Sequence, residues 1–128
     1  MVKKRLQPTK AELEILRVLW KTGPLSVREV QNILSESKSS GYTSVLKTMQ
    51  IMADKGLVKR NETSRTHVYS ATAGEAQTQL QLVQDLVDRA FGGSAAALVL
   101  RALSAEGTSD SELREIRKLI DDYREKQS

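Results

Sequence analysis

One face of a predicted helix carries the side chains with the clearest potential to bind a ligand. On a helical wheel of residues 42–55, Lys47 lies opposite the apolar side chains, while Tyr42, Thr43 and Ser44 extend that face toward the helix start. Short hydroxylated and basic side chains can approach the floor of a nucleic-acid groove and donate hydrogen bonds to base edges or phosphates. For this helix alone, an ordinary solvated face explains the pattern equally well.

Basic residues are concentrated in the first part of the chain. Residues 1–71 hold 13 Lys and Arg against 6 Asp and Glu, whereas residues 72–128 hold 7 against 10, although the formal charge of the whole chain is only +4. The first part is therefore the candidate to bind a polyanion. Lys59, Arg60 and Arg65 lie there and are expected to contact phosphates.

The same part shows the element pattern of a winged helix-turn-helix. Two capping boxes, Thr9 with Glu12 and Ser26 with Glu29, predict the starts of two helices. A third helix follows over residues 42–55, and two short strands, expected at 57–61 and 66–70, then flank a turn. In such an arrangement the third helix enters the major groove and the basic hairpin rests on the flanking backbone.

The remaining residues predict three further helices that cannot bury their own apolar side chains. Two of them carry apolar residues at alternating spacings of three and four, and the helix between them is apolar almost all round. Pairing with a second copy is the simplest way to cover these side chains, and packing against the first part in a monomer is the alternative. The residues expected at a dimer interface are Leu80, Val83, Val87, Leu98, Leu113, Ile116, Ile120 and Tyr123.

The sequence lacks the groups on which most enzyme and metal sites depend. It has no cysteine, a single histidine, His67, and no glycine-rich phosphate loop or nucleophile elbow, so we expect neither catalysis nor a cofactor. Its longest apolar run, residues 95–100, is far shorter than the ~20 residues of a membrane span. No apolar run follows the basic N-terminal residues, as a secretory signal requires. We expect a cytoplasmic protein without membrane insertion.

Five short runs of sequence are distinctive in combination. They are residues 12–20 (ELEILRVLW), 42–49 (YTSVLKTM), 54–58 (DKGLV), 65–69 (RTHVY) and 98–103 (LVLRAL). Together they resemble the BlaI/MecI family of penicillinase repressors. The resemblance implies a dimeric winged-helix repressor that binds a palindromic operator upstream of antibiotic-resistance or stress genes. It also implies that Tyr42, Thr43, Ser44 and Lys47 contact base edges or adjacent phosphates, and that Arg65 touches the DNA backbone from the wing.

The resemblance further implies a way in which the repressor is released. Antibiotic-responsive members of the family are substrates of a membrane metallopeptidase sensor that cuts an Asn–Phe bond in the helix after the glycine break. The aligned bond here is Arg101–Ala102, which is the candidate cleavage site. Alanine is too small to make the contacts that a protease pocket makes with a large aromatic side chain. Cleavage at another site, or another signal, therefore explains release of the repressor equally well.

The sequence therefore predicts a mainly helical homodimeric repressor. Residues 1–71 form a winged helix-turn-helix domain that binds double-stranded operator DNA, and residues 72–128 form a helical dimerisation region. Two alternatives stay open: a winged-helix regulator gated by a small ligand, and a winged-helix module that binds protein instead of DNA. Only DNA binding through several phosphates should weaken by orders of magnitude as salt rises.

Overall fold

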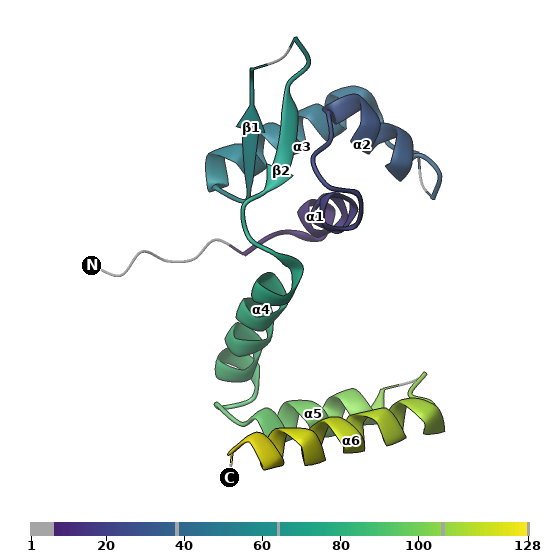
Figure 1. Cartoon of the computed structure of the whole chain (residues 1–128), viewed down its shortest axis with the longest axis vertical. Coiled ribbons are helices and arrows are strands. Elements are labelled where there is room, and N and C mark those ends of the chain that lie inside the picture. The colour runs from purple at the N-terminus through teal and green to yellow at the C-terminus, as the bar shows by residue number, and fades with distance from the viewer. Residues whose placement is uncertain (1–6, 38, 64, 106, 128) are drawn as a thin grey trace, which may run out of the picture. The chain divides into compact units, whose positions relative to one another are not determined.

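Helices make up most of the described chain, as predicted. The computed structural model describes residues 7–37, 39–63, 65–105 and 107–127, so the basic N-terminal residues 1–6 lie outside it. In chain order the elements are α1 (Lys10–Thr22), α2 (Val27–Leu34), α3 (Tyr42–Lys55), β1 (Val58–Asn61), β2 (Val68–Ala71), α4 (Glu75–Ala90), α5 (Ala95–Ser104) and α6 (Asp110–Gln127) (Figure 1). They fall into two compact units, residues 1–82 and 83–128, and each is described by itself.

Both predicted capping boxes start their helices. At α1 the Thr9 hydroxyl accepts a hydrogen bond from the Glu12 amide at 3.2 Å, and the Glu12 carboxylate accepts one from the Thr9 amide at 2.8 Å. Ser26 and Glu29 form the same reciprocal pair at α2, at 3.2 and 2.9 Å. Each box satisfies two amide donors that the first turn of a helix leaves without a partner, which fixes where the helix begins.

The end of α3 sets the start of the hairpin one residue later than predicted. Gly56 adopts a left-handed conformation with φ +83°, which suits a residue without a β-carbon. The Leu57 amide donates to the Met52 carbonyl at 2.9 Å and closes the last turn of the helix. Leu57 therefore belongs to the helix cap, and β1 begins at Val58.

Strands β1 and β2 form an antiparallel hairpin, here called the wing (residues 58–71), in which Val58 pairs with Ala71 and Asn61 with Val68. The second strand begins two residues later than predicted. The Asn61 side-chain oxygen accepts the Thr63 amide at 3.0 Å, so the chain turns directly after β1. Ser64, expected in this turn, lies outside the described residues.

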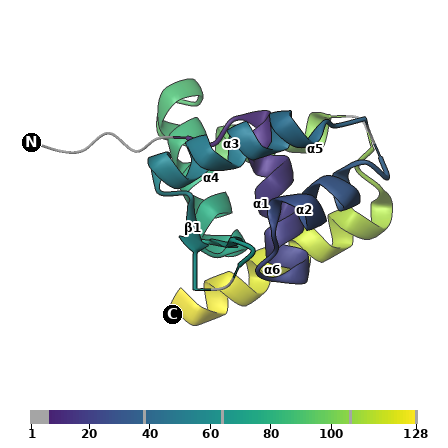
Figure 2. The same cartoon turned by 90° about the horizontal axis from the view of Figure 1, so that it is seen from above.

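A single apolar core joins the three helices of the first unit to the wing. Figure 2 shows α3 crossing α1 near the start of α1, with α2 beside α1. A β-bridge from Leu25 to Tyr69 ties the segment before α2 to β2. The core side chains are Ile15, Leu16, Leu19, Val27, Val30, Leu34, Val45, Met49, Met52, Val58 and Tyr69. This is the winged helix-turn-helix that the sequence predicts.

The first unit extends beyond the wing into the beginning of α4. The Thr72 amide donates to the Leu57 carbonyl at 3.0 Å, and the Trp20 indole donates to the Ala73 carbonyl at 2.9 Å. These two bonds hold residues 72–74 against Leu57 and Trp20, and α4 starts directly after them at Glu75.

The second unit exposes most of its apolar side chains. Val87 on α4 is only 5% exposed, whereas α5 and α6 contain no buried side chain among their described residues. Ser94 caps α5 through the Ala97 amide at 3.0 Å. Over the described residues, no helix combines the length and the apolar character needed to cross a membrane.

Candidate nucleic-acid interface

The predicted binding face of α3 is open to solvent. The opposite side chains, Val45, Met49 and Met52, are buried in the core, which fixes the rotation of the helix about its axis. All four residues predicted to bind a ligand, Tyr42, Thr43, Ser44 and Lys47, are exposed. The sequence pattern thus predicted correctly which side of this helix faces solvent.

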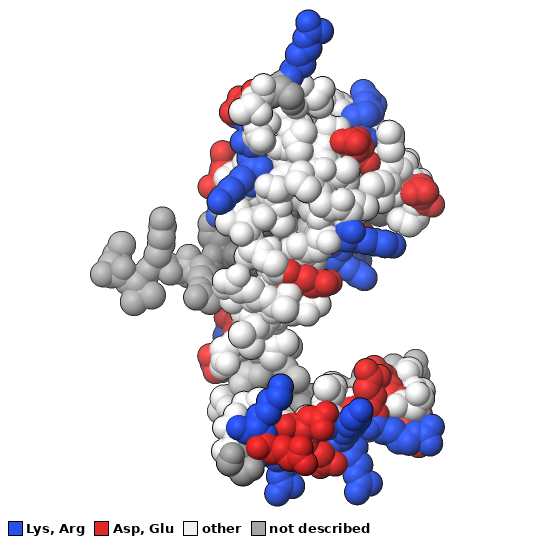
Figure 3. Space-filling model, viewed as in Figure 1, with Lys and Arg blue, Asp and Glu red and all other residues white. Residues whose placement is uncertain are grey.

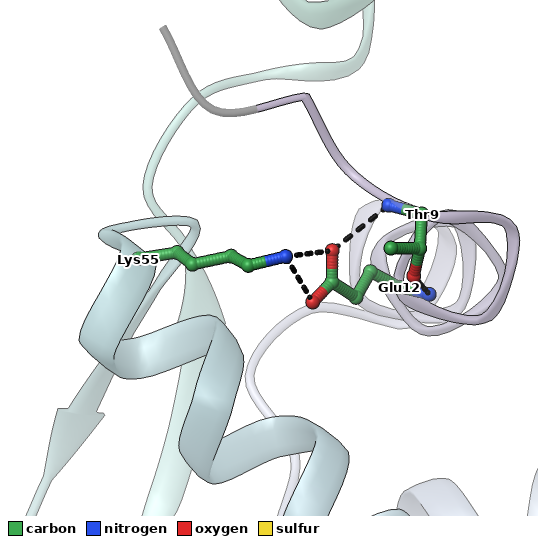
Figure 4. Close-up of polar contacts among 3 residues, drawn as sticks. All are labelled: Thr9, Glu12 and Lys55. Carbon is green, nitrogen blue, oxygen red and sulfur yellow. Dashed lines mark hydrogen bonds and ion pairs between the residues drawn. The ribbon is translucent and has the colours of Figure 1, made fainter. Parts of the chain in front are cut away.

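An ion pair holds the end of α3 against the start of α1. The Lys55 ammonium lies 3.0 and 2.9 Å from the two carboxylate oxygens of Glu12, whose side chain also accepts the Thr9 amide (Figure 4). Burial raises the pKa of Glu12, but the Thr9 amide and Lys55 together outweigh it and lower this pKa below its ordinary value of 4.5. The same carboxylate therefore caps α1 and positions α3.

The start of α3 differs from the starts of α1 and α2. Its N-cap residue is Gly41, and among the described residues no side chain caps it. The amide groups of its first turn are consequently left for water or for a ligand.

A notch of about 310 Å³ lies between α2, the start of α3 and the wing. Its walls bring Tyr42 of α3 together with Arg65 and His67 of the wing. They also include Arg28 of α2, whose guanidinium carbon lies 4.3 Å from the centre of the Tyr42 ring. Sequence reasoning missed Arg28, because an arginine in the first turn of a short helix resembles an ordinary solvated residue.

The two basic residues of β1 are exposed but occupy different surroundings. Lys59 and Arg60 are neighbours on a strand, so their side chains leave opposite faces of the hairpin. A side-chain hydrogen bond with Tyr69 raises the pKa of Arg60 above its ordinary value, and the negative charge of Glu62 adds a smaller effect in the same direction. Arg60 lines a second hollow with Asp54 and Glu62, whereas Arg65 lines the notch.

Charge is unevenly distributed over the face drawn in Figure 3. Lys and Arg side chains project from the hairpin end of the first unit with single Asp and Glu side chains between them, and acidic and basic side chains are crowded together over α6 (Figure 3). Among the described residues, no three His, Asp or Glu side chains lie close enough together to hold a metal ion.

The residues predicted at a dimer interface are mostly accessible in the single chain. Leu80, Val83, Leu113, Ile120 and Tyr123 are exposed. Leu98 and Ile116 are half-buried, and Val87 is buried within the chain. Arg101 and Ala102, the candidate cleavage bond, are both exposed on α5.

Comparison with known proteins gives one consistent result. The sequence profile of the family described as penicillinase repressor matches residues 8–122. The penicillinase repressor of Bacillus licheniformis is 23% identical over 96% of this chain and 96% of its own length. The transcriptional regulator BlaI of Mycobacterium tuberculosis is 33% identical over 69% of this chain and 66% of its own length.

A solved structure resembles the first part of the chain. It is the monomeric form of Bacillus licheniformis BlaI in complex with the blaP half-operator. The match has 27% identity and a TM-score of 0.50, and it covers 59% of this chain and 92% of the BlaI chain.

Proposed function

The chain belongs to the penicillinase repressor family, a family of repressors and not of enzymes, and from this premise we propose that it represses transcription by binding operator DNA. In this proposal residues 1–71 are the DNA-binding domain and residues 72–128 pair two subunits. Bound at a promoter in the cytoplasm, the protein excludes RNA polymerase by occupancy.

The exposed face of α3 beside the basic notch is the observation that carries the proposal. Tyr42, Thr43, Ser44 and Lys47 point away from the core, and the wing supplies cations next to them. This combination matches the needs of a winged helix, which reads base edges with its third helix and rests its wing on phosphates. The BlaI structure with a half-operator supports the same use of the fold in a relative.

The apolar side chains of the second unit support pairing with a second copy. Two linked domains would bind two half-sites of a palindromic operator, and the second contact would benefit from a high effective concentration. Loss of the dimer would then release the DNA. A signal that acts on residues 72–128 is sufficient for this, whether it is cleavage at Arg101–Ala102 by a membrane metallopeptidase sensor, cleavage elsewhere or a change without cleavage.

The test is selection of bound duplexes from a random library, followed by titration of the selected duplex at several salt concentrations. If several phosphates are contacted, affinity should fall by orders of magnitude between roughly 50 and 200 mM salt. A scrambled duplex of equal length should bind more weakly by about 10³-fold or more. Failure to enrich any duplex, even at low salt, would overturn the proposal.

A further inference from the structure

The stacked pair of Arg28 and Tyr42 links α2 to the first residue of α3. The guanidinium carbon of Arg28 lies 4.3 Å from the centre of the Tyr42 ring, within the range of a cation–π contact. A second contact holds the same side chain, because Arg28 Nη1 donates to the Gln31 side-chain oxygen at 3.1 Å. This hydrogen bond uses one of the five N–H donors of a guanidinium.

The wall of the notch opposite this pair is also basic. Arg65 and His67 come from the wing, so an anion in the notch faces cationic or polar groups from two elements that are far apart in sequence. None of the described residues that line the notch is Asp or Glu, and the carboxylate of Glu62 reaches its edge only at His67 Nε2, 3.6 Å away. The hollow beside Arg60 differs in this respect, since Asp54 and Glu62 line it and would repel an anion.

We propose that the notch binds one phosphate of the operator backbone, that Arg28 is its main ligand from α2, and that the Tyr42 ring is the platform that holds Arg28 in place. This inference rests on the proposed function. It assigns to Tyr42 a positioning role, whereas Thr43, Ser44 and Lys47 stay available for base edges.

Holding Arg28 in advance favours binding for an entropic reason. A free arginine side chain loses rotamer freedom when it is fixed against a phosphate, and that loss opposes binding. The Tyr42 ring and Gln31 already restrict the side chain, so less freedom is lost on contact. The planar guanidinium also suits a phosphate, with which it can form two parallel hydrogen bonds.

The test uses the full-length protein, the selected duplex and a scrambled duplex, each titrated over a range of salt. Arg28→Ala should weaken binding to both duplexes alike by about tenfold, as expected for one charged hydrogen-bonded contact. It should also lower the slope of log affinity against log salt by about one, as for loss of one phosphate contact. Arg28→Lys should keep the slope and lose part of the affinity, since lysine is a point charge without the planar fork.

The role of Tyr42 is tested by combining substitutions. Tyr42→Phe keeps the ring and should lose much less affinity than Tyr42→Ala, which should weaken binding to both duplexes. Tyr42→Ala added to Arg28→Ala should cause little further loss, because the platform has nothing left to hold. Arg17→Ala on α1 is the charge-matched control, since Arg17 lines a different hollow and should leave the slope unchanged.

Three outcomes overturn the inference. The first is that Arg28→Ala keeps the wild-type salt slope and affinity. The second is that Arg28→Ala loses affinity for the selected duplex alone. The third is that the losses of binding free energy caused by Arg28→Ala and Tyr42→Ala add up fully in the double variant. Circular dichroism and Trp20 fluorescence check that each variant is folded. If the wild type itself enriches no duplex, the proposed function has failed, whereas a binding wild type with an unaffected Arg28→Ala refutes this inference alone.

Discussion

The guanidinium of Arg60 and the carboxylate of Glu62 form an ion pair at 3.2 Å on the wing. The other oxygen of Glu62 lies 3.6 Å from His67 Nε2, so one acidic side chain faces two basic partners. In a protein that binds DNA, this carboxylate partly cancels the positive charge of the surface that meets the phosphates.

Glu62→Gln should therefore tighten DNA binding. Removing the negative charge leaves Arg60 without its ionic partner, and affinity for specific and scrambled duplexes should rise alike, by roughly twofold to fivefold. The increase should shrink as salt rises, because salt screens exposed charges. Gel-shift titration measures both effects. Glu115→Gln, the same charge change on α6, is the control, and equal tightening in both variants would argue against a local effect of the wing.

Lys47 and Arg65 should differ in what they contribute to binding. Lys47→Ala should cost on the order of 1 to 3 kcal/mol of binding free energy and should blur the preference between operators, if Lys47 donates to a base. Arg65→Ala should weaken all sequences about equally and lower the salt slope by about one, as for a contact to the backbone. The assignment of α3 and the wing to DNA is wrong if both variants keep wild-type affinity.

Glu12 makes the stability of the first unit depend on pH. Its pKa is lowered in the folded protein, so its contribution is fully present above pH 4.5 and is lost as pH falls through the lowered value. Glu12→Gln should reduce the free energy of unfolding by about 1 to 2 kcal/mol at pH 7, because it breaks the pair with Lys55 and weakens the cap of α1.

The difference in the free energy of unfolding between Glu12→Gln and the wild type should become smaller as the pH falls below 4.5. Urea unfolding followed by fluorescence of Trp20, the one tryptophan of the chain, reports on this unit. Glu36→Gln, at an exposed glutamate of the same unit, is the control. Its free energy of unfolding should differ from that of the wild type by the same small amount at every pH. A constant difference across the pH range would mean that Glu12 acts through packing and not through its charge.

Patterns within one or two helical turns predicted much of the fold. The boxes of Thr9 with Glu12 and Ser26 with Glu29 act on neighbouring residues, so the sequence alone locates them. The strand starts were one or two residues early, because the Leu57 amide completes the helix cap and Asn61 starts the turn.

Contacts between distant residues could not be predicted. Glu12 and Lys55 are 43 residues apart, and nothing in a capping box indicates that its carboxylate will also bind a lysine. Arg28 and Tyr42 meet only because the core sets α2 against α3. The exposed face of α3 was found because its buried face has a strict apolar spacing, whereas Arg28 has no such pattern around it.

The apolar stripe of α6 gives the sharpest test of the second unit. Ile120 is 51% exposed in the single chain, so replacing it by aspartate removes little packing within the subunit but would place a charge inside a dimer interface. Ile120→Asp should therefore convert a dimer to a monomer in sedimentation velocity while α6 stays helical by circular dichroism. Lys118→Asp, about half a turn away on the opposite face, should stay dimeric although it changes the charge more.

The same pair of variants connects assembly to DNA binding. A monomer loses the effective concentration of the second half-site, so Ile120→Asp should bind a duplex with two half-sites more weakly by about 10²-fold or more. Its affinity for a single half-site should equal that of the wild type, because the face of α3 is untouched. A wild-type dimer that survives the substitution would place the interface elsewhere, and a wild type that sediments as a monomer would remove the dimer from the mechanism.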